Sequence, residues 1–168
     1  GLDTGKPLKR ADFLHIVARE QGFATWPALK SASDLMGLDR AARLQRLRVA
    51  LFHGQHDVAT ALLEADPDLT EGQFCMQVGV YDRPAVAQAL AGDPGLALRA
   101  DGPRTPILHL AFSRWIKARP ALEADMLAIA QMLVDHGADA NDAFPHEPGS
   151  DHKLSALYGA IGHADNMA

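Results

Sequence analysis

The sequence is short of cysteine, of signal-peptide character and of long apolar runs, and each shortage excludes a class of protein. Cys75 is the only cysteine among 168 residues, so the chain forms no disulfide within itself, which favours a reducing compartment. No apolar run approaches the roughly 20 residues of a membrane-spanning helix. Residues 1–10 also lack the apolar core of a signal peptide. We therefore expect a cytoplasmic protein without a membrane partner.

Aromatic and β-branched residues are also scarce, which disfavours a β-sheet protein. The chain has two Trp and two Tyr and is rich in Ala and Leu, a composition that favours closely packed helices. Its 48% apolar and 22% charged residues are ordinary for a folded protein, and 168 residues correspond to one domain. The composition therefore predicts an all-α fold in a single domain.

The charge is unevenly distributed along the chain, which has a net charge of −5. Residues 1–50 carry nine Lys/Arg against five Asp/Glu, whereas residues 51–168 carry seven against sixteen. A basic front and an acidic body do not make one continuous surface for nucleic acid. The sequence also lacks a glycine-rich phosphate loop, a serine nucleophile elbow and a paired-carboxylate motif. We therefore expect no nucleic-acid partner, no enzymatic activity and no cofactor.

The clearest local pattern is a helix that stops at a glycine in residues 129–141. Ile129 and Leu133 fall on one helical face, and Gly137 sits where a left-handed C-cap is favourable because glycine has no Cβ. Asp139 follows as a turn residue, so the chain reverses sharply here. The pattern predicts the end of the second helix of a helical hairpin.

This pattern recurs along the chain. Residues 58–62 align with residues 86–90, 28 positions later, and residues 129–133 form a third copy a further 43 positions on. Residues 105–111, Thr-Pro-Ile-Leu-His-Leu-Ala, resemble the Thr-Pro-Leu-His-Leu-Ala signature that starts the first helix of an ankyrin repeat. Against a period of about 33 residues, the second unit is short and the third carries an insertion near residues 114–125.

The resemblance to ankyrin-repeat proteins implies a helical solenoid of about three to four helix-turn-helix repeats with short hairpin loops. We expect this solenoid over residues 38–168, with Asp39 capping its first helix, Leu44, Leu47 and Leu51 on the buried face, and a last repeat that is incomplete. An open end of a solenoid exposes apolar surface. The chain is then a fragment, or a neighbour or second copy covers this end.

Residues 1–37 are expected to form a helical cap on the solenoid. A helix is predicted over residues 11–21, with Phe13, Ile16 and Val17 as its buried stripe. The string from residue 17 to residue 30 resembles a leader seen ahead of some bacterial ankyrin-repeat domains. In this interpretation Phe23 and Trp26 pack on the first repeat.

Histidines and the cysteine are the first candidates for chemistry. His109 belongs to the repeat signature, so we expect its ring to hydrogen-bond the hairpin backbone. Cys75 lies between apolar neighbours and is expected to be an inert core residue. His53 and His56 flank a helix break, and His146, Glu147, Asp151 and His152 crowd one loop. Neither spacing matches a zinc signature, and we expect no metal; a metal enzyme built on the loop is the alternative.

A run of arginines on one helix is the main basic feature. Arg40, Arg43, Arg46 and Arg48 lie opposite the leucines of that helix. We interpret them as a solvated helix face; the alternative is a docking surface for an acidic protein or a phosphate.

The resemblance implies a non-catalytic module that binds another protein through one concave side formed by hairpin tips and inner helices. We predict binding residues at tips and helix ends that the core does not need: Tyr81, Asp82, Arg83, Asp101, Arg104, Ser113, Arg114, Trp115 and Tyr158. For Trp115 the alternative is that it packs the inserted segment. A second hypothesis is a regulatory or recruiting segment of a larger enzyme.

Overall fold

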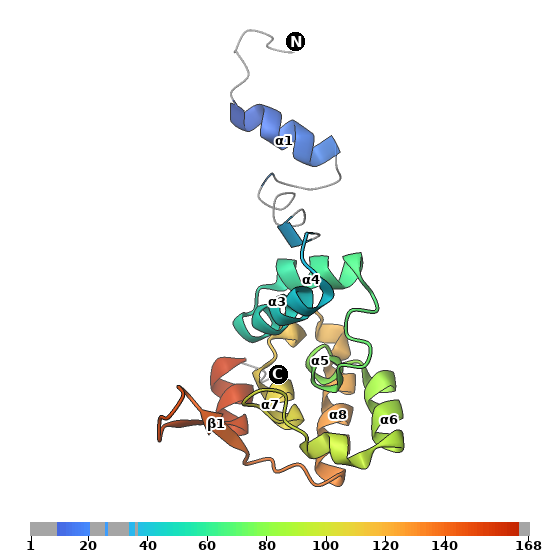
Figure 1. Cartoon of the computed structure of the whole chain (residues 1–168), viewed down its shortest axis with the longest axis vertical. Coiled ribbons are helices and arrows are strands. Elements are labelled where there is room, and N and C mark those ends of the chain that lie inside the picture. The colour runs from blue at the N-terminus through green and yellow to red at the C-terminus, as the bar shows by residue number, and fades with distance from the viewer. Residues whose placement is uncertain (1–9, 21–25, 27–33, 36, 165–168) are drawn as a thin grey trace.

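Helices that pair side by side make up most of the computed structural model, which describes residues 10–20, 26, 34–35 and 37–164. Helix α3 packs on α4, α5 on α6 and α7 on α8, and successive pairs meet through α5 on α7 and α6 on α8 (Figure 1). These elements are α3 (Arg40–His53), α4 (His56–Ala65), α5 (Phe74–Gly79), α6 (Arg83–Gly92), α7 (Pro106–Phe112) and α8 (Glu123–Asp135). The described chain is therefore predominantly helical, as the composition predicts.

Short elements connect and follow these helices. They are the 3₁₀ turns η1 (Pro94–Leu98), η2 (Trp115–Lys117) and η3 (Pro120–Leu122), the strands β1 (Ala143–Pro145) and β2 (Lys153–Ser155), helix α9 (Ala156–Tyr158) and the π-helical turn η4 (Gly159–His163). Turns η2 and η3 occupy the insertion predicted near residues 114–125.

The ends of α3 follow from local chemistry. Asp39 is the N-cap residue, and the backbone N–H of Ala42 donates to its carboxylate over 2.8 Å, which confirms the predicted cap. At the other end Gly54 has φ 67° and its N–H donates to the carbonyl of Ala50. A left-handed glycine at this position ends the helix at the predicted break.

The end of α8 also matches the sequence pattern. Gly137 has φ 93°, and the N–H of Ala138 returns to the carbonyl of Leu133 over 3.0 Å. The carboxylate of Asp139 then accepts the backbone N–H of Asn141 over 2.8 Å. The chain therefore reverses after α8 through the residues that predicted the turn.

Leucines and aromatic residues fill the space between the helices. Leu47 and Leu51 are buried and Leu44 packs against the core, so the predicted inner face of α3 is confirmed. The largest fully buried side chains are Tyr81, Phe112, Leu47, Leu62, Leu69, Met76, Leu90, Leu108, Ile129, Leu133, Val78 and Val86.

Helix α3 and the last turn, η4, touch each other. The Nε2 of His163 in η4 lies 2.8 Å from the carbonyl oxygen of Phe52 at the end of α3. The rings of these two residues are 4.3 Å apart, and Phe112 stacks 5.7 Å from Phe52. This contact joins the end of α3 to the last described turn.

A small sheet corrects the all-α prediction. Strands β1 and β2 pair antiparallel, with Phe144 opposite Leu154. Phe144 is buried and its ring lies 5.1 Å from that of Phe112, so this strand supplies a core side chain that the helical pattern did not reveal. The predicted loop 146–152 is the connection between these two strands.

Helix α1 (Arg10–Glu20) forms where a helix was predicted, but its apolar stripe is not buried. Phe13, Ile16 and Val17 are 55%, 45% and 42% exposed, and Figure 1 shows α1 apart from the other helices. The expected packing of this stripe is therefore wrong. Leu35, just before α3, does join the core, whereas Phe23 lies outside the described residues. Among the described helices, none combines the length and hydropathy that a bilayer span needs.

Candidate functional site

Three of the nine predicted binding residues are core residues, which corrects their assignment. Tyr81, Ser113 and Trp115 are only 2%, 2% and 4% exposed. Tyr81 takes a left-handed backbone conformation with φ 64°, and its hydroxyl donates to the carbonyl of Ser113 over 3.1 Å. The hydroxyl of Ser113 in turn donates to the carbonyl of Gly79 over 2.7 Å. These side chains join α5 to the segment after α7 and have no surface left for a partner.

Trp115 packs the inserted segment, which was the alternative interpretation of this residue. Its side chain is buried, and the guanidinium of Arg119 lies 4.9 Å over the ring. Of these two side chains, Arg119 is exposed to solvent and the indole of Trp115 is not. Trp115 therefore contributes to the stability of the segment between α7 and α8.

Asp82, Arg83 and Tyr158 lie at separate places on the surface. Asp82 is the N-cap of α6 and accepts the N–H of Ala85 over 3.1 Å, so its role is local. Arg83 is 3.7 Å from the carboxylate of Asp125 in an exposed ion pair. Tyr158 in α9 is 49% exposed. The structure does not bring these residues into one site.

Asp101 and Arg104 lie together in the turn before α7, and Arg114 follows the other end of that helix. Asp101 and Arg104 are joined by a backbone hydrogen bond of 2.9 Å, and the carboxylate of Asp101 is ion-paired with Arg48. The Arg104 guanidinium lies 4.8 Å over the ring of Phe52 and 5.8 Å from the ring of Phe144. The backbone N–H of Arg114 donates to the carbonyl of Leu51 over 3.0 Å.

The repeat-signature histidine has the predicted structural role. His109 is 4% exposed, and its Nε2 lies 3.3 Å from the carbonyl oxygen of Asp101 at the hairpin tip. Burial, and after it the nearby charge of Arg104, lower the pKa of His109 to about 4. The ring is therefore neutral at pH 7.

Cys75, Asp101 and His109 place their donor atoms within 4.8 Å of one another, a grouping that the sequence did not reveal. Thiolate, carboxylate and imidazole are zinc ligands. Here, however, Arg48 holds the carboxylate of Asp101, and its charge and that of Arg104 oppose a divalent cation. Burial also raises the pKa of the Cys75 thiol to about 12, so it is a protonated core cysteine as predicted. We assign no metal or nucleophile here.

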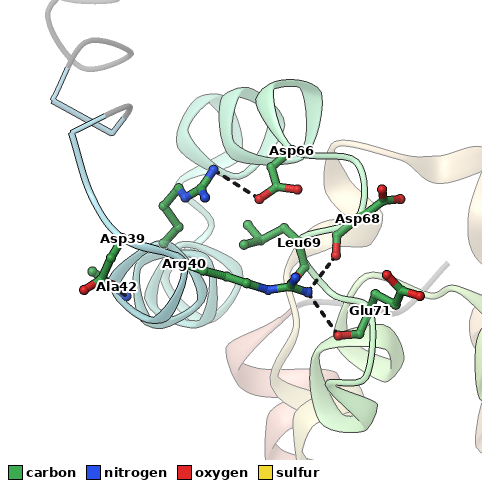
Figure 2. A network of polar contacts seen from close by, with 8 residues as sticks. Asp39, Arg40, Ala42, Asp66, Asp68, Leu69 and Glu71 are labelled. Atoms are coloured by element: carbon green, nitrogen blue, oxygen red, sulfur yellow. Dashed lines mark hydrogen bonds and ion pairs between the residues drawn. The ribbon is translucent and has the colours of Figure 1, made fainter.

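The arginines of α3 stay in part exposed, as the interpretation of a solvated face expects, but they also bind neighbouring parts of the chain. The guanidinium of Arg40 donates to the carbonyls of Asp68, Leu69 and Glu71 over 2.9, 3.2 and 3.1 Å. Figure 2 shows Arg40 reaching across to the chain that follows α4, where it holds three main-chain oxygens. This arginine links two elements of the fold.

The other arginines of this run are also engaged. Arg43 pairs with Asp66 over 3.1 Å, and Arg46 donates to the side-chain oxygen of Gln55 over 2.7 Å. Arg48 joins Asp101. The run is therefore a set of internal connections, and the alternative of a docking surface has little free charge to use.

The histidine-rich loop lies at the tip of the β1–β2 hairpin. His146, Glu147, Asp151 and His152 are exposed, and the two imidazole rings lie edge to face at 5.8 Å. The N–H of His146 donates to the carbonyl of His152 over 2.9 Å, which continues the hairpin backbone ladder. The exposed loop is a structural turn, and metal binding by it stays untested.

The surface that the sequence analysis missed is an apolar groove between α7, α8 and α9. Its volume is about 450 Å³. It is lined by Ile107, Leu110, Ala111, Met126, Leu127, Ala130, Ala140, Asn141, Ala156, Leu157 and Ala160. Leu127 and Leu157 on opposite sides are 57% and 64% exposed. The available signal was α8 itself, where apolar residues such as Met126, Leu127 and Ala130 extend beyond the stripe needed for one buried face.

The groove lies in an acidic part of the chain. Residues 120–152 contain seven Asp/Glu and no Lys or Arg. Five of the eleven residues that line the groove come from this stretch.

Comparisons with known proteins give no relative: no family model, curated protein or solved structure matches the chain.

Proposed function

We propose that this chain is a non-catalytic protein-binding module, and that its groove takes an amphipathic helix of a partner protein. The observation that carries the proposal is the pair of exposed leucines, Leu127 and Leu157, on the two sides of one apolar groove. Apolar patches of this kind are typical of interaction sites, and a groove between helices is a common seat for the apolar face of another helix.

The stacking of the helices supports a helix as the occupant. Helix α6 is covered along one side by α8, the second helix of the next pair. The groove beside α8 and α9 is the corresponding position one step further along. The resemblance to ankyrin repeats favours the same interpretation, because such arrays bind proteins through surfaces that their stacked helices present. We propose that a partner helix continues the stack.

The charges around the groove favour a basic partner helix. With seven acidic residues and no Lys or Arg between residues 120 and 152, a helix with Lys or Arg on the margins of its apolar stripe has the complementary charge. Such complementarity mainly raises the rate of association, so binding is expected to weaken with added salt.

The ionisation of the buried candidates supports a role without catalysis. The thiol of Cys75 is protonated because burial raises its pKa to about 12, and the imidazole of His109 is held by a backbone carbonyl. An activated nucleophile needs the opposite shift in a cysteine, next to a base that is free to accept its proton.

The proposal is tested by selecting binders from a library of displayed helical peptides, with the wild-type protein as bait. Affinities of the selected peptides are then measured by fluorescence anisotropy for the wild type, Leu127→Asp and Leu157→Asp. Because an aspartate places a charge in the apolar seat, each variant is expected to weaken binding by about tenfold or more.

Leu98→Asp is the matched control. Leu98 in η1 is 55% exposed and does not line the groove, so this variant should bind within about twofold of the wild type. Peptides that bind all four proteins equally, or a selection that returns no helix, would contradict the proposal. A concentration-dependent dimer that Leu157→Asp abolishes would replace the partner helix with a second copy of this chain.

A further inference from the structure

Two arginines that flank helix α7 have no partner for their charge. Among the described residues, the guanidinium groups of Arg104 and Arg114 form no hydrogen bond or ion pair, although both side chains are partly buried. The Nε–H of Arg114 is buried without an acceptor, as are those of Arg43 and Arg48, whose terminal guanidinium nitrogens are ion-paired. A buried donor on a charged group is destabilising when it is left unpaired, and such a group calls for an explanation.

Both arginines lie at the C-terminal end of α3. Arg104 lies over the ring of Phe52 at 4.8 Å, and the Arg114 side chain lies against Gly54, two residues further along. His163 completes the set, with its ring 4.3 Å from that of Phe52. We call these four residues the Phe52 cluster: Phe52, Arg104, Arg114 and His163.

The carboxylate that acts on the cluster is shared with another arginine. Burial is the main cause that lowers the pKa of His163. The charged groups that act on this pKa are Arg114, His53 and Arg104, and all three lower it as well. The nearest carboxylate described for Arg104 is that of Asp101, and it is already ion-paired with Arg48. In a chain with a net charge of −5, this is a local excess of positive charge.

The end of α3 accounts for part of this positive charge. The carbonyl of Phe52 lies 2.8 Å from His163 Nε2, and the carbonyl of Leu51 accepts the backbone N–H of Arg114. A helix C-terminus carries about half a negative charge, which attracts cations. Two guanidinium groups exceed that charge, and both keep free donors.

We infer that the Phe52 cluster binds an oxyanion, the phosphate or carboxylate group of a ligand, through the guanidinium groups of Arg104 and Arg114. Planar guanidinium donors match both groups in charge and geometry. The Phe52 ring supports one side of Arg104, so less side-chain freedom is lost when the anion binds. This inference does not depend on the groove of α7, α8 and α9.

The test is an NMR titration that observes the arginine Nε–H signals directly. Sodium phosphate is added in one series and sodium acetate in another, each at an ionic strength held constant with sodium chloride. We expect the Nε–H signals of Arg104 and Arg114 to shift saturably, with the buried Nε–H of Arg114 moving downfield as it gains an acceptor. A response to phosphate alone identifies a phosphate ligand, and a response to acetate extends it to carboxylates.

Substitutions then locate the site. Arg104→Gln and Arg114→Gln should each weaken binding by about tenfold or more, because each removes a charge-assisted hydrogen-bonding group. Arg104→Lys keeps the charge and should lose less. Arg119→Gln is the matched control, since Arg119 also lies over an aromatic ring, 4.9 Å from that of Trp115, and is outside the cluster.

The inference is overturned if neither anion gives a saturable shift. It is also overturned if Arg119→Gln weakens binding as much as Arg104→Gln, because the effect is then one of general charge. Unchanged amide spectra elsewhere in the molecule show that each variant is folded. If a glutamine variant is not folded, Arg104→Lys still tests the inference.

Discussion

The arginines of α3 and those of the Phe52 cluster are the same residue type in opposite situations. Arg40 holds three backbone carbonyls, and Arg43 pairs with Asp66. Arg104 and Arg114 have guanidinium groups without a partner among the described residues. The first set is dense in the sequence and is used within the fold, whereas the second is sparse in the sequence and gathers only through folding.

A run of charged residues in a sequence is therefore only a weak indication of a binding site. Arginines four or so residues apart on one helix share a face, and the neighbouring chain satisfies them there. A ligand is better indicated by a charged group that folding has partly buried and left unpaired. Three properties distinguish the two sets of arginines: the aromatic rings around Phe52, the positive charge near His109, and the contribution of each arginine to the free energy of unfolding.

Truncating Phe112, the core ring stacked on Phe52, should have the largest effect. Phe112 is fully buried, stacks on Phe52 at 5.7 Å and contacts Phe144 at 5.1 Å between ring centroids. Phe112→Ala is therefore expected to lower the free energy of unfolding by about 3–5 kcal/mol, measured by urea denaturation. Phe13→Ala is the control; this ring is 55% exposed, and a change within about 0.5 kcal/mol is expected. Equal losses for the two variants would contradict the described packing.

Acid should reveal the charge around His109. Its pKa of about 4 in the folded protein is below the usual 6.5 because of burial and then Arg104, so the unfolded chain binds a proton first as the pH falls. The contribution of His109 to the free energy of unfolding is fully present above pH 6.5. It is lost as the pH falls from 6.5 to about 4, by about 3 kcal/mol in all.

The pH dependence is measured by denaturation of the wild type and His109→Gln across this range. The wild type should show the steeper loss. Histidine NMR titration adds a direct comparison of the two arginine sets: Arg104→Met should raise the pKa of His109, and Arg40→Met should leave it unchanged. A flat difference between wild type and His109→Gln would show that the histidine is not held neutral by the fold.

The arginines themselves should show the smallest effects and a clear order. Arg40→Met removes three hydrogen bonds to carbonyls and is expected to lower the free energy of unfolding by about 1–2 kcal/mol. Arg104→Met removes the contacts of the guanidinium with the rings of Phe52 and Phe144 and should cost less than about 1 kcal/mol. Thermal or urea denaturation of both variants decides the order, and the reverse order would undo the comparison.

Local features were predictable from the sequence. The cap at Asp39, the break at Gly54 and the reversal at Gly137 each depend on a few neighbouring residues, and the structure has all three. The helical hairpin role of His109 was predictable for the same reason, since its partner is the carbonyl of Asp101 only eight positions away. The ankyrin-repeat assignment stays a prediction.

Features that depend on distant contacts were not predictable. The left-handed Tyr81 points into the core instead of lying at a tip, and the stripe of α1 stays exposed although its spacing is that of a buried face. The groove and the Phe52 cluster both combine residues from at least two helices far apart in the chain. Helical periodicity records that a face is apolar and says nothing of which element covers it.

The contact between His163 and Phe52 also has a consequence for how the molecule unfolds. In a linear stack of helix pairs each unit touches only its neighbours, so the ends can fray while the middle stays folded. A hydrogen bond that joins positions 111 residues apart links the first pair to the last turn. Loss of either end then weakens the other, which favours a single cooperative transition over stepwise melting and slows the search for the native state.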